Sequence, residues 1–188
     1  MRLSAPRIAP LEDAEMTEDQ REALKPMSAD GRRPLNIFRT LARAPKALTR
    51  FNEWGSYVLS RRNSLPARER EIVILRVGYL CKSGYEFTQH TRIALNEGLS
   101  ADEIANIKKG AGAGWSEADA ALIRAADELV KDHFVSDATW KALGEHFDDK
   151  QRMDVVFTIG QYTQVSMFLN TFGVQLDPGQ TLDPDLKA

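Results

Sequence analysis

Residues 66–90 read PAREREIVILRVGYLCKSGYEFTQH, and this stretch decides the fold of the 188-residue chain. Its first part, residues 66–80, is apolar on several faces, which is typical of a buried helix. The run Ile72–Leu75 also has the composition of a short strand, but the flanking Ala, Arg and Glu residues are strong helix formers. We therefore expect a helix here, with Pro66 in its first turn and Ser64 available as its cap.

A second helix is expected directly after a short break. Ser83 and Gly84 interrupt the pattern, and a helical pattern resumes over residues 85–96, before a glycine that suits a helix end. If these two helices form a hairpin, its turn lies at residues 82–84.

Such a hairpin would bring side chains that can do chemistry to one place. Glu86 and His90 are four residues apart, so they share a helix face. Glu71, in the preceding helix, lies about one turn further from the bend than His90, an offset of roughly 6 Å that a long side chain can close. An imidazole in such a place can move a proton near neutral pH, and a carboxylate can orient it.

The same residues also have a purely structural interpretation. Ser83 and Glu86 have the spacing of a capping box, in which Glu86 bonds a backbone N–H and His90 is an ordinary mid-helix histidine. Glu71 would then be a solvated charge paired with a neighbouring arginine. The sequence alone leaves both interpretations open.

The rest of the chain also has helical periodicity, with capping signals at the helix starts and no alternating pattern. Further helices are expected at residues 17–24, 47–61, 100–110, 116–132, 136–146 and 148–172. The fold class is therefore predicted to be all-α. Prolines interrupt the first part of the chain, so we expect an N-terminal arm over residues 1–44, a helical domain over residues 45–173 and a C-terminal tail over residues 174–188.

Composition narrows the classes of function. The formal net charge of −2 favours neither nucleic acid nor an anionic membrane as a partner. No apolar run is long enough to span a bilayer, and residues 1–11 do not have the apolar core of a signal peptide. A single cysteine cannot form an intramolecular disulfide, which fits a reducing cytoplasm.

Two further residues near the hairpin need an explanation. Cys81 is the single cysteine, and a buried cysteine usually behaves as a small hydrophobe, whereas a reactive one needs a lowered pKa and exposure. Arg76 lies in the apolar helix, where an unpaired charge is costly, so it needs an acidic partner or a bound carboxylate. We expect no metal site, because Glu86, His90 and Cys81 are too few for a closed zinc site.

The segment from Leu65–Glu71 through Gly98–Ile104, together with residues 122–129 and 160–162, resembles the carboxymuconolactone decarboxylase and AhpD-like alkylhydroperoxidase superfamily. The resemblance covers most of residues 45–173. It implies an all-helical bundle built around a helical hairpin. It also implies a homo-oligomer, as a dimer, trimer or hexamer.

The resemblance also has implications for the site. The peroxidase branch of this superfamily uses a Cys-x-x-Cys pair, a histidine four residues after the second cysteine and a glutamate in the preceding helix. These positions correspond to Ser83 and Glu86 for the cysteines, His90 for the histidine and Glu71 for the glutamate. The chain therefore has the proton-handling pair without the dithiol, and Cys81 is two positions too early to replace the first cysteine. The decarboxylase branch needs neither the cysteine pair nor a cofactor.

We therefore expect cofactor-free proton transfer or decarboxylation on a small organic acid or lactone. His90 would be the general acid or base, and Glu71 and Glu86 would set its tautomer and pKa. Ser83 and Arg76 would help to hold an anionic substrate. Two alternatives remain open, a thiol-dependent peroxidase that uses the single cysteine and a catalytically silent helical oligomer.

Overall fold

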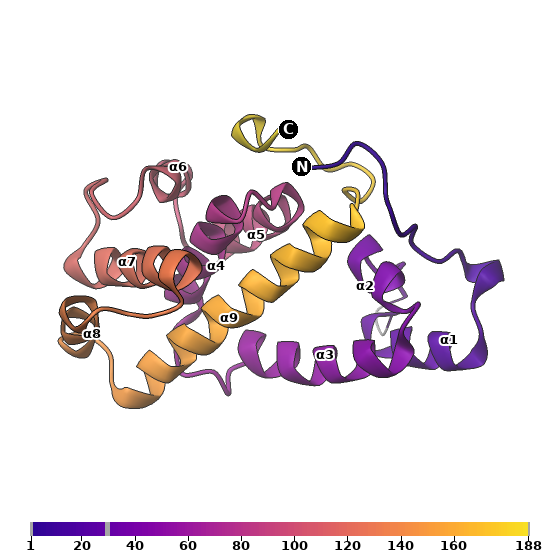
Figure 1. Ribbon diagram of the computed structural model, residues 1–188, viewed down its shortest axis with the longest axis horizontal. Helices are drawn as coiled ribbons and strands as arrows, with labels where there is room; N and C mark the ends of the chain where they lie inside the picture. Colours follow the sequence, from indigo (N-terminus) through magenta and orange to yellow (C-terminus); the bar gives the residue numbers. More distant parts are fainter. Residues whose placement is uncertain (1, 29–30, 188) are drawn as a thin grey trace.

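The computed structural model describes residues 2–28 and 31–187, and within them the chain is helical without any strand. The predicted all-α class is thereby confirmed (Figure 1). The α-helices are α1 (Glu18–Leu24), α2 (Asn36–Leu41), α3 (Pro45–Leu59), α4 (Ala67–Leu80), α5 (Gly84–Asn96), α6 (Ala101–Lys109), α7 (Glu117–Asp132), α8 (Asp137–Gly144) and α9 (Asp149–Phe172). Within the described residues, no helix combines the length and the apolar character that crossing a membrane requires.

Helix α4 is the centre of the packing and contacts α5, α7 and α9. Every residue from Arg70 to Gly78 is buried, which explains why the sequence of this helix is apolar on several faces. One side of α4 packs through Val73 against α7 and α9, and another packs through Ile72 against Phe87 of α5. In Figure 1, α9 runs diagonally across the molecule, and α2 lies near its C-terminal end. Helix α3 contacts much of the length of α9, from Tyr57 against Asp154 to Phe51 against Phe168.

The turn between α4 and α5 lies where the sequence predicted it. Lys82 adopts a left-handed backbone conformation, with φ of 53°, and reverses the chain. The N–H of Ser83 then donates to the carbonyl of Gly78 at 2.8 Å. The side chain of Ser83 caps nothing, so the capping box that the spacing suggested for Ser83 and Glu86 is not formed.

Capping elsewhere follows the sequence signals at most helices. The N-terminal caps that form as expected are Thr17, Ser100, Ser116, Ser136 and Asp148. Ser64 differs, because its N–H and its hydroxyl both donate to the buried carboxylate of Asp154, at 2.7 and 2.6 Å. It therefore ties the connection before α4 to α9, and Pro66 occupies the N-cap position.

The first 44 residues contain a helix that the sequence pattern did not reveal. Helix α2 is short and begins without a side-chain cap, so it carries neither of the signals used to find helices. Its first N–H, at Asn36, instead donates to the side chain of Asp177 in the C-terminal segment. The N–H groups of Arg7 and Ile8 donate to the carbonyl of Phe172, so the N-terminal segment packs on the end of α9. The division into arm, domain and tail stays a prediction.

Candidate active site

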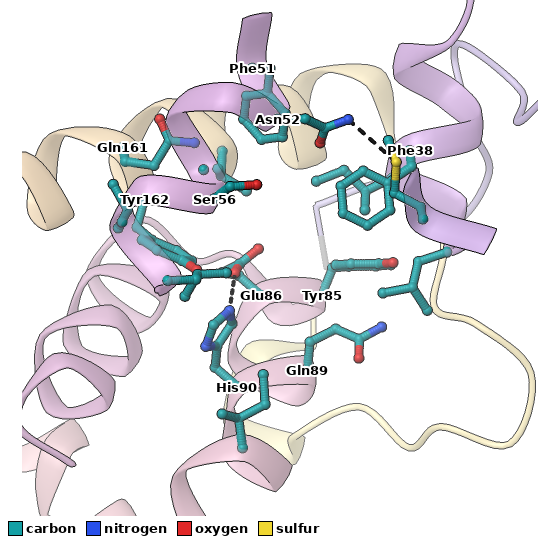
Figure 2. A pocket seen from close by; sticks show the side chains of 18 of the residues that line it. Phe38, Phe51, Asn52, Ser56, Tyr85, Glu86, Gln89, His90, Gln161 and Tyr162 are labelled. Atoms are coloured by element: carbon teal, nitrogen blue, oxygen red, sulfur yellow. Dashed lines mark hydrogen bonds and ion pairs between the residues drawn. The ribbon is translucent and has the colours of Figure 1, made fainter. Parts of the chain in front are cut away.

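A cavity of about 400 Å³ lies between α2, α3, α5 and α9 (Figure 2). Most of its lining is apolar and includes Ile37, Phe38, Phe51, Val58, Ile93 and Val165. The uncharged polar residues in the lining include Asn52, Ser56, Gln89 and Gln161. Among the described residues that line it, the charged or titratable groups other than tyrosine are Glu86, His90 and Arg92. The cavity therefore combines an apolar enclosure with one compact acid–base group.

That group is a histidine held between two carboxylates. The Nδ1 atom of His90 lies 2.7 Å from Oε2 of Glu71, and its Nε2 atom lies 3.0 Å from Oε1 of Glu86. The exposed fraction is 5% for His90, 5% for Glu86 and 1% for Glu71. Hydrogen bonds between ionised partners are short and strong, and burial protects them from competing water. The imidazole is therefore fixed in orientation from both sides.

The electrostatics favour the charged form of this histidine. Burial alone would lower the pKa of His90, but the charge and hydrogen bond of Glu71, reinforced by Glu86, raise this pKa to about 10. At neutral pH the site therefore holds an imidazolium between two carboxylates, with a hydrogen bond from Nδ1 to Glu71 and an ion pair between Nε2 and Glu86. The three side chains together then carry a net charge of −1, from two negative groups and one positive group.

Tyr162 of α9 completes the surroundings of the imidazole. Its ring meets the ring of His90 edge to face, with the centroids 4.9 Å apart and the planes at 86°. Burial, with the charges of Glu86 and Glu71 nearby, raises the pKa of Tyr162 well above its ordinary value. The phenol therefore stays neutral and adds an aromatic wall rather than a second base.

Glu71, His90 and Glu86 differ in their access to the cavity, and this determines which of them can contact a ligand. Glu86 and His90 line the cavity, whereas Glu71 is not part of the lining. Both nitrogens of His90 are already bonded to carboxylates. No donor among the described residues bonds the second carboxylate oxygen of Glu86, so this oxygen is the acceptor offered to the cavity. Figure 2 shows Glu86 between His90 and the space bordered by Ser56.

These contacts settle the interpretations that the sequence had left open. Glu86 bonds His90 and does not return to the backbone at the start of α5. Glu71 bonds His90 and has no ion pair with an arginine among the described residues. The neighbouring Arg68 instead pairs with Glu103 and Asp119. The hairpin therefore brings together all three residues for which an acid–base role was expected.

A neighbouring wall of the cavity depends on the C-terminal segment. Tyr85 and Gln89 of α5 both line the cavity, and both donate to Oδ2 of Asp177, at 2.6 and 3.0 Å. Sequence reasoning missed these residues. Tyr85 and Gln89 have the same i, i+4 spacing as Glu86 and His90, one position earlier, and this was the available signal. Nothing in the sequence pointed to Asp177.

The two residues expected to hold an anionic substrate lie elsewhere. The guanidinium of Arg76 donates to Asp127 at 2.6 Å and to the carbonyl of Ile107 at 2.7 Å, so it has the acidic partner that its burial required. Arg76 does not line the cavity. Ser83 is buried outside the lining as well, and its hydroxyl has no hydrogen-bond partner in the described structure.

Cys81 lines a different cavity from His90. Its neighbours there include Arg2, His133 and Ser166. Burial raises the pKa of the Cys81 thiol, and this effect outweighs the opposing influence of Ser166 and Arg2. The structure therefore does not bring Cys81 together with the acid–base group. Among the described residues no cluster of three His, Cys, Asp or Glu side chains is arranged to hold a metal ion.

Comparison with known families agrees with this architecture. Residues 45–128 match the sequence model of the carboxymuconolactone decarboxylase family, in agreement with the resemblance seen in the sequence. The matched segment contains the α4–α5 hairpin with Glu71, Glu86 and His90. None of the curated proteins matches the sequence.

Solved structures share the fold at low sequence identity. One is an uncharacterized peroxidase-related protein with an alkylhydroperoxidase AhpD core from Ralstonia eutropha, with 20% identity, 91% of this chain and 93% of that chain covered, and a TM-score of 0.78. Another is a variant of the debrominase Bmp8 in complex with 2,3,4-tribromopyrrole, with 11% identity, coverage of 93% and 94%, and a TM-score of 0.75. A peroxidase-related protein from a Silicibacter species has 13% identity, coverage of 94% and 92%, and a TM-score of 0.74. These structures share the AhpD-like fold with this chain.

Proposed function

We propose that the protein is a cofactor-free acid–base enzyme that removes a proton from a small organic substrate, or returns one to it. The observation that carries this proposal is the buried bridge from Glu71 through His90 to Glu86, which ends at a cavity. In this proposal Glu86 touches the substrate, His90 positions Glu86 and supplies positive charge, and Glu71 fixes the imidazole. This differs from the role expected from the sequence, in which His90 itself met the substrate.

The proton can move in either direction through this arrangement. As a base, Glu86 takes a substrate proton on its free oxygen, while the imidazolium stays bonded to the other oxygen and the electron pair remains on the substrate. As an acid, Glu86 gives a proton to the substrate and receives one from Nε2 of His90. A positioned acid or base typically contributes a factor of about 10² to 10⁴ in rate.

A decarboxylase-like lyase is the specific form of this proposal that the family match supports. When a substrate carboxylate leaves as carbon dioxide, the carbon keeps the electron pair and must gain a proton. Nε2 of His90 would first pass a proton to Glu86, and Glu86 would then deliver it to that carbon. A small organic acid or a lactone would be the substrate, and assembly of the chain as a homo-oligomer stays part of the prediction.

Proton exchange in deuterated water tests the proposal. The full-length protein, with a metal chelator present and no added thiol, would be incubated with a panel of small lactones and 3-oxo acids. Nuclear magnetic resonance would follow deuterium uptake and loss of carbon dioxide. We expect turnover by the wild-type protein and a fall of about 10²- to 10⁴-fold in the Glu86→Gln and His90→Gln variants.

The matched control is Glu97→Gln, which removes an exposed carboxylate at the other end of α5. This variant should turn over substrate like the wild type. An unchanged rate in a folded His90→Gln protein would contradict the proposed function, as would the same loss in the Glu97→Gln control.

The two alternatives have less structural support. A peroxidase that uses Cys81 needs a reactive thiolate, but burial raises the pKa of this thiol. A catalytically silent oligomer leaves unexplained why three ionisable groups are buried beside a cavity, since burying charges costs stability that apolar packing does not. We therefore rank acid–base catalysis first.

A further inference from the structure

We infer that the cavity between α3, α5 and α9 takes an uncharged, mainly apolar small molecule that donates one hydrogen bond, from an O–H or N–H group, to the free oxygen of Glu86. The inference rests on the proposed function and narrows its substrate class. Of the two substrate types expected from the sequence, an organic acid and a lactone, it disfavours the negatively charged one, and it therefore favours proton transfer over decarboxylation of a carboxylate within the proposed function.

The net charge beside the cavity is the first argument for an uncharged ligand. Glu71, His90 and Glu86 together hold one more negative charge than positive charge, and Glu86 directs that excess to the cavity. A buried anion needs a paired cation or dense hydrogen bonding to offset its loss of hydration. A carboxylate bound beside Glu86 would instead face a like charge, which is strongly unfavourable in an enclosed site.

No arginine or lysine among the described residues forms an ion pair with Glu86. Arg92 is the one arginine or lysine among the described residues that line the cavity, and its side chain is exposed, so solvent screens its charge. Arg70 acts electrostatically on Tyr162 but lies outside the lining, and it donates to the carbonyl of Ser60. Arg76, which the sequence had suggested for anion binding, is held by Asp127.

The rest of the lining fits an uncharged molecule. Aromatic and aliphatic side chains from α2, α3 and α9 form most of the wall, and they favour apolar surface. The polar groups among them are neutral amides and a hydroxyl, those of Asn52, Gln89, Gln161 and Ser56, which can orient a ligand without requiring charge (Figure 2).

The free oxygen of Glu86 determines the one polar feature that the ligand needs. This oxygen is an acceptor without a donor among the described residues, whereas the other oxygen bonds His90. A ligand O–H or N–H group that points at it would form a charge-assisted hydrogen bond.

Three probes of similar size separate these requirements. Phenol is neutral with a donor, anisole is neutral without a donor, and benzoate is anionic. Their affinities for the full-length protein would be measured by calorimetry near neutral pH. Side-chain amide signals of Gln89 and Gln161 would report by nuclear magnetic resonance whether a probe occupies this cavity. We expect the affinity for phenol to exceed the affinity for anisole and the affinity for benzoate by a factor of about ten or more.

The Glu86→Gln variant gives a signature that a structural role of Glu86 would not produce. Removing the charge should weaken phenol binding and strengthen benzoate binding, so the preference between the two narrows or reverses. Glu97→Gln should leave both affinities unchanged. Circular dichroism would check that each variant is folded, and the wild-type ranking of the probes decides the matter if Glu86→Gln does not fold.

The outcomes distinguish the inference from the proposed function. Benzoate binding as tight as phenol binding, or no phenol binding in this cavity, would overturn the inference. A phenol preference that depends on Glu86 supports the inference even if no turnover is found, and absent turnover would count against the proposed function alone. Efficient turnover of a carboxylate substrate in this cavity would overturn the inference and leave the proposed function standing.

Discussion

The two cavities beside the α4–α5 hairpin differ in whether their surroundings stabilise the charged form of the titratable group that each contains. In one, His90 is buried between Glu71 and Glu86, and its charged form is stabilised. In the other, Cys81 is half-buried beside Ser166, and its charged form is disfavoured. Cys81 and His90 are nine positions apart in the sequence, yet only one of them has the surroundings that acid–base or nucleophilic chemistry requires.

The comparison shows that burial by itself does not activate a group. Desolvation disfavours the charged form of both side chains. At His90 the two neighbouring carboxylates outweigh that effect, whereas at Cys81 the opposing influence of Ser166 and Arg2 does not. The ionised partner, rather than the depth of burial, therefore separates a candidate catalytic group from a structural one.

The largest expected effect comes from breaking the buried bridge at Glu71. Glu71→Gln keeps the shape of the side chain but leaves the imidazolium with one carboxylate, and loss of one partner from a buried pair typically costs about 3–5 kcal/mol. Urea unfolding at neutral pH would measure the loss, with Glu97→Gln as the control. A loss of unfolding free energy below about 0.5 kcal/mol, the size typical of surface substitutions, would mean that Glu71 does not stabilise the charged form of His90.

The pH dependence of stability sharpens the same comparison. The pKa of His90 is raised in the folded protein, so its contribution to stability is fully present below the unfolded pKa near 6.5 and is lost as the pH rises through about 10. The difference in unfolding free energy between wild type and His90→Gln should therefore shrink by at least about 1 kcal/mol between pH 7 and pH 10. A difference that grows with pH would show that the histidine is neutral when folded.

A smaller effect is expected at the wall next to Glu86. Asp177→Asn weakens the acceptor shared by Tyr85 and Gln89, and loss of such hydrogen bonds typically costs about 1 kcal/mol each. Phenol affinity should fall by a few-fold, as measured by calorimetry. Asp185→Asn is the matched control, because Asp185 lies in the same C-terminal segment but bonds Lys108 away from the cavity. Equal effects of the two substitutions would argue against a specific role of Asp177.

The smallest effect is expected at the cavity that contains Cys81. Cys81→Ser should leave turnover unchanged and alter stability by less than about 1 kcal/mol, within the range of small side-chain changes. Because the pKa of the thiol is raised, iodoacetamide should label the folded protein about tenfold or more slowly than the unfolded one. The intact mass of the protein after peroxide treatment tests the opposite outcome, oxidation of Cys81. Rapid formation of a sulfenate at Cys81 would make this the reactive cavity.

Much of the fold was predictable because it depends on local patterns. Continuous apolar character gave α4, and the break at Ser83 and Gly84 gave the hairpin turn. The short helix α2 was missed, because it is held by a hydrogen bond from Asn36 to Asp177, which lies 141 positions away. A contact at that separation leaves no periodic signal in the sequence. The same reason explains why the wall formed by Tyr85 and Gln89 was not foreseen.

By itself, the sequence determined that Glu86 and His90 share one face of a helix and that Glu71 lies in the helix before it, because helix geometry fixes which residues share a face. The tertiary structure alone decided that Glu86, and not His90, presents a free acceptor to the cavity. It also decided that Arg76 and Cys81 lie elsewhere. Those outcomes depend on which side chains of α3, α7 and α9 surround the hairpin. Local sequence patterns do not predict packing between segments that are distant in the sequence.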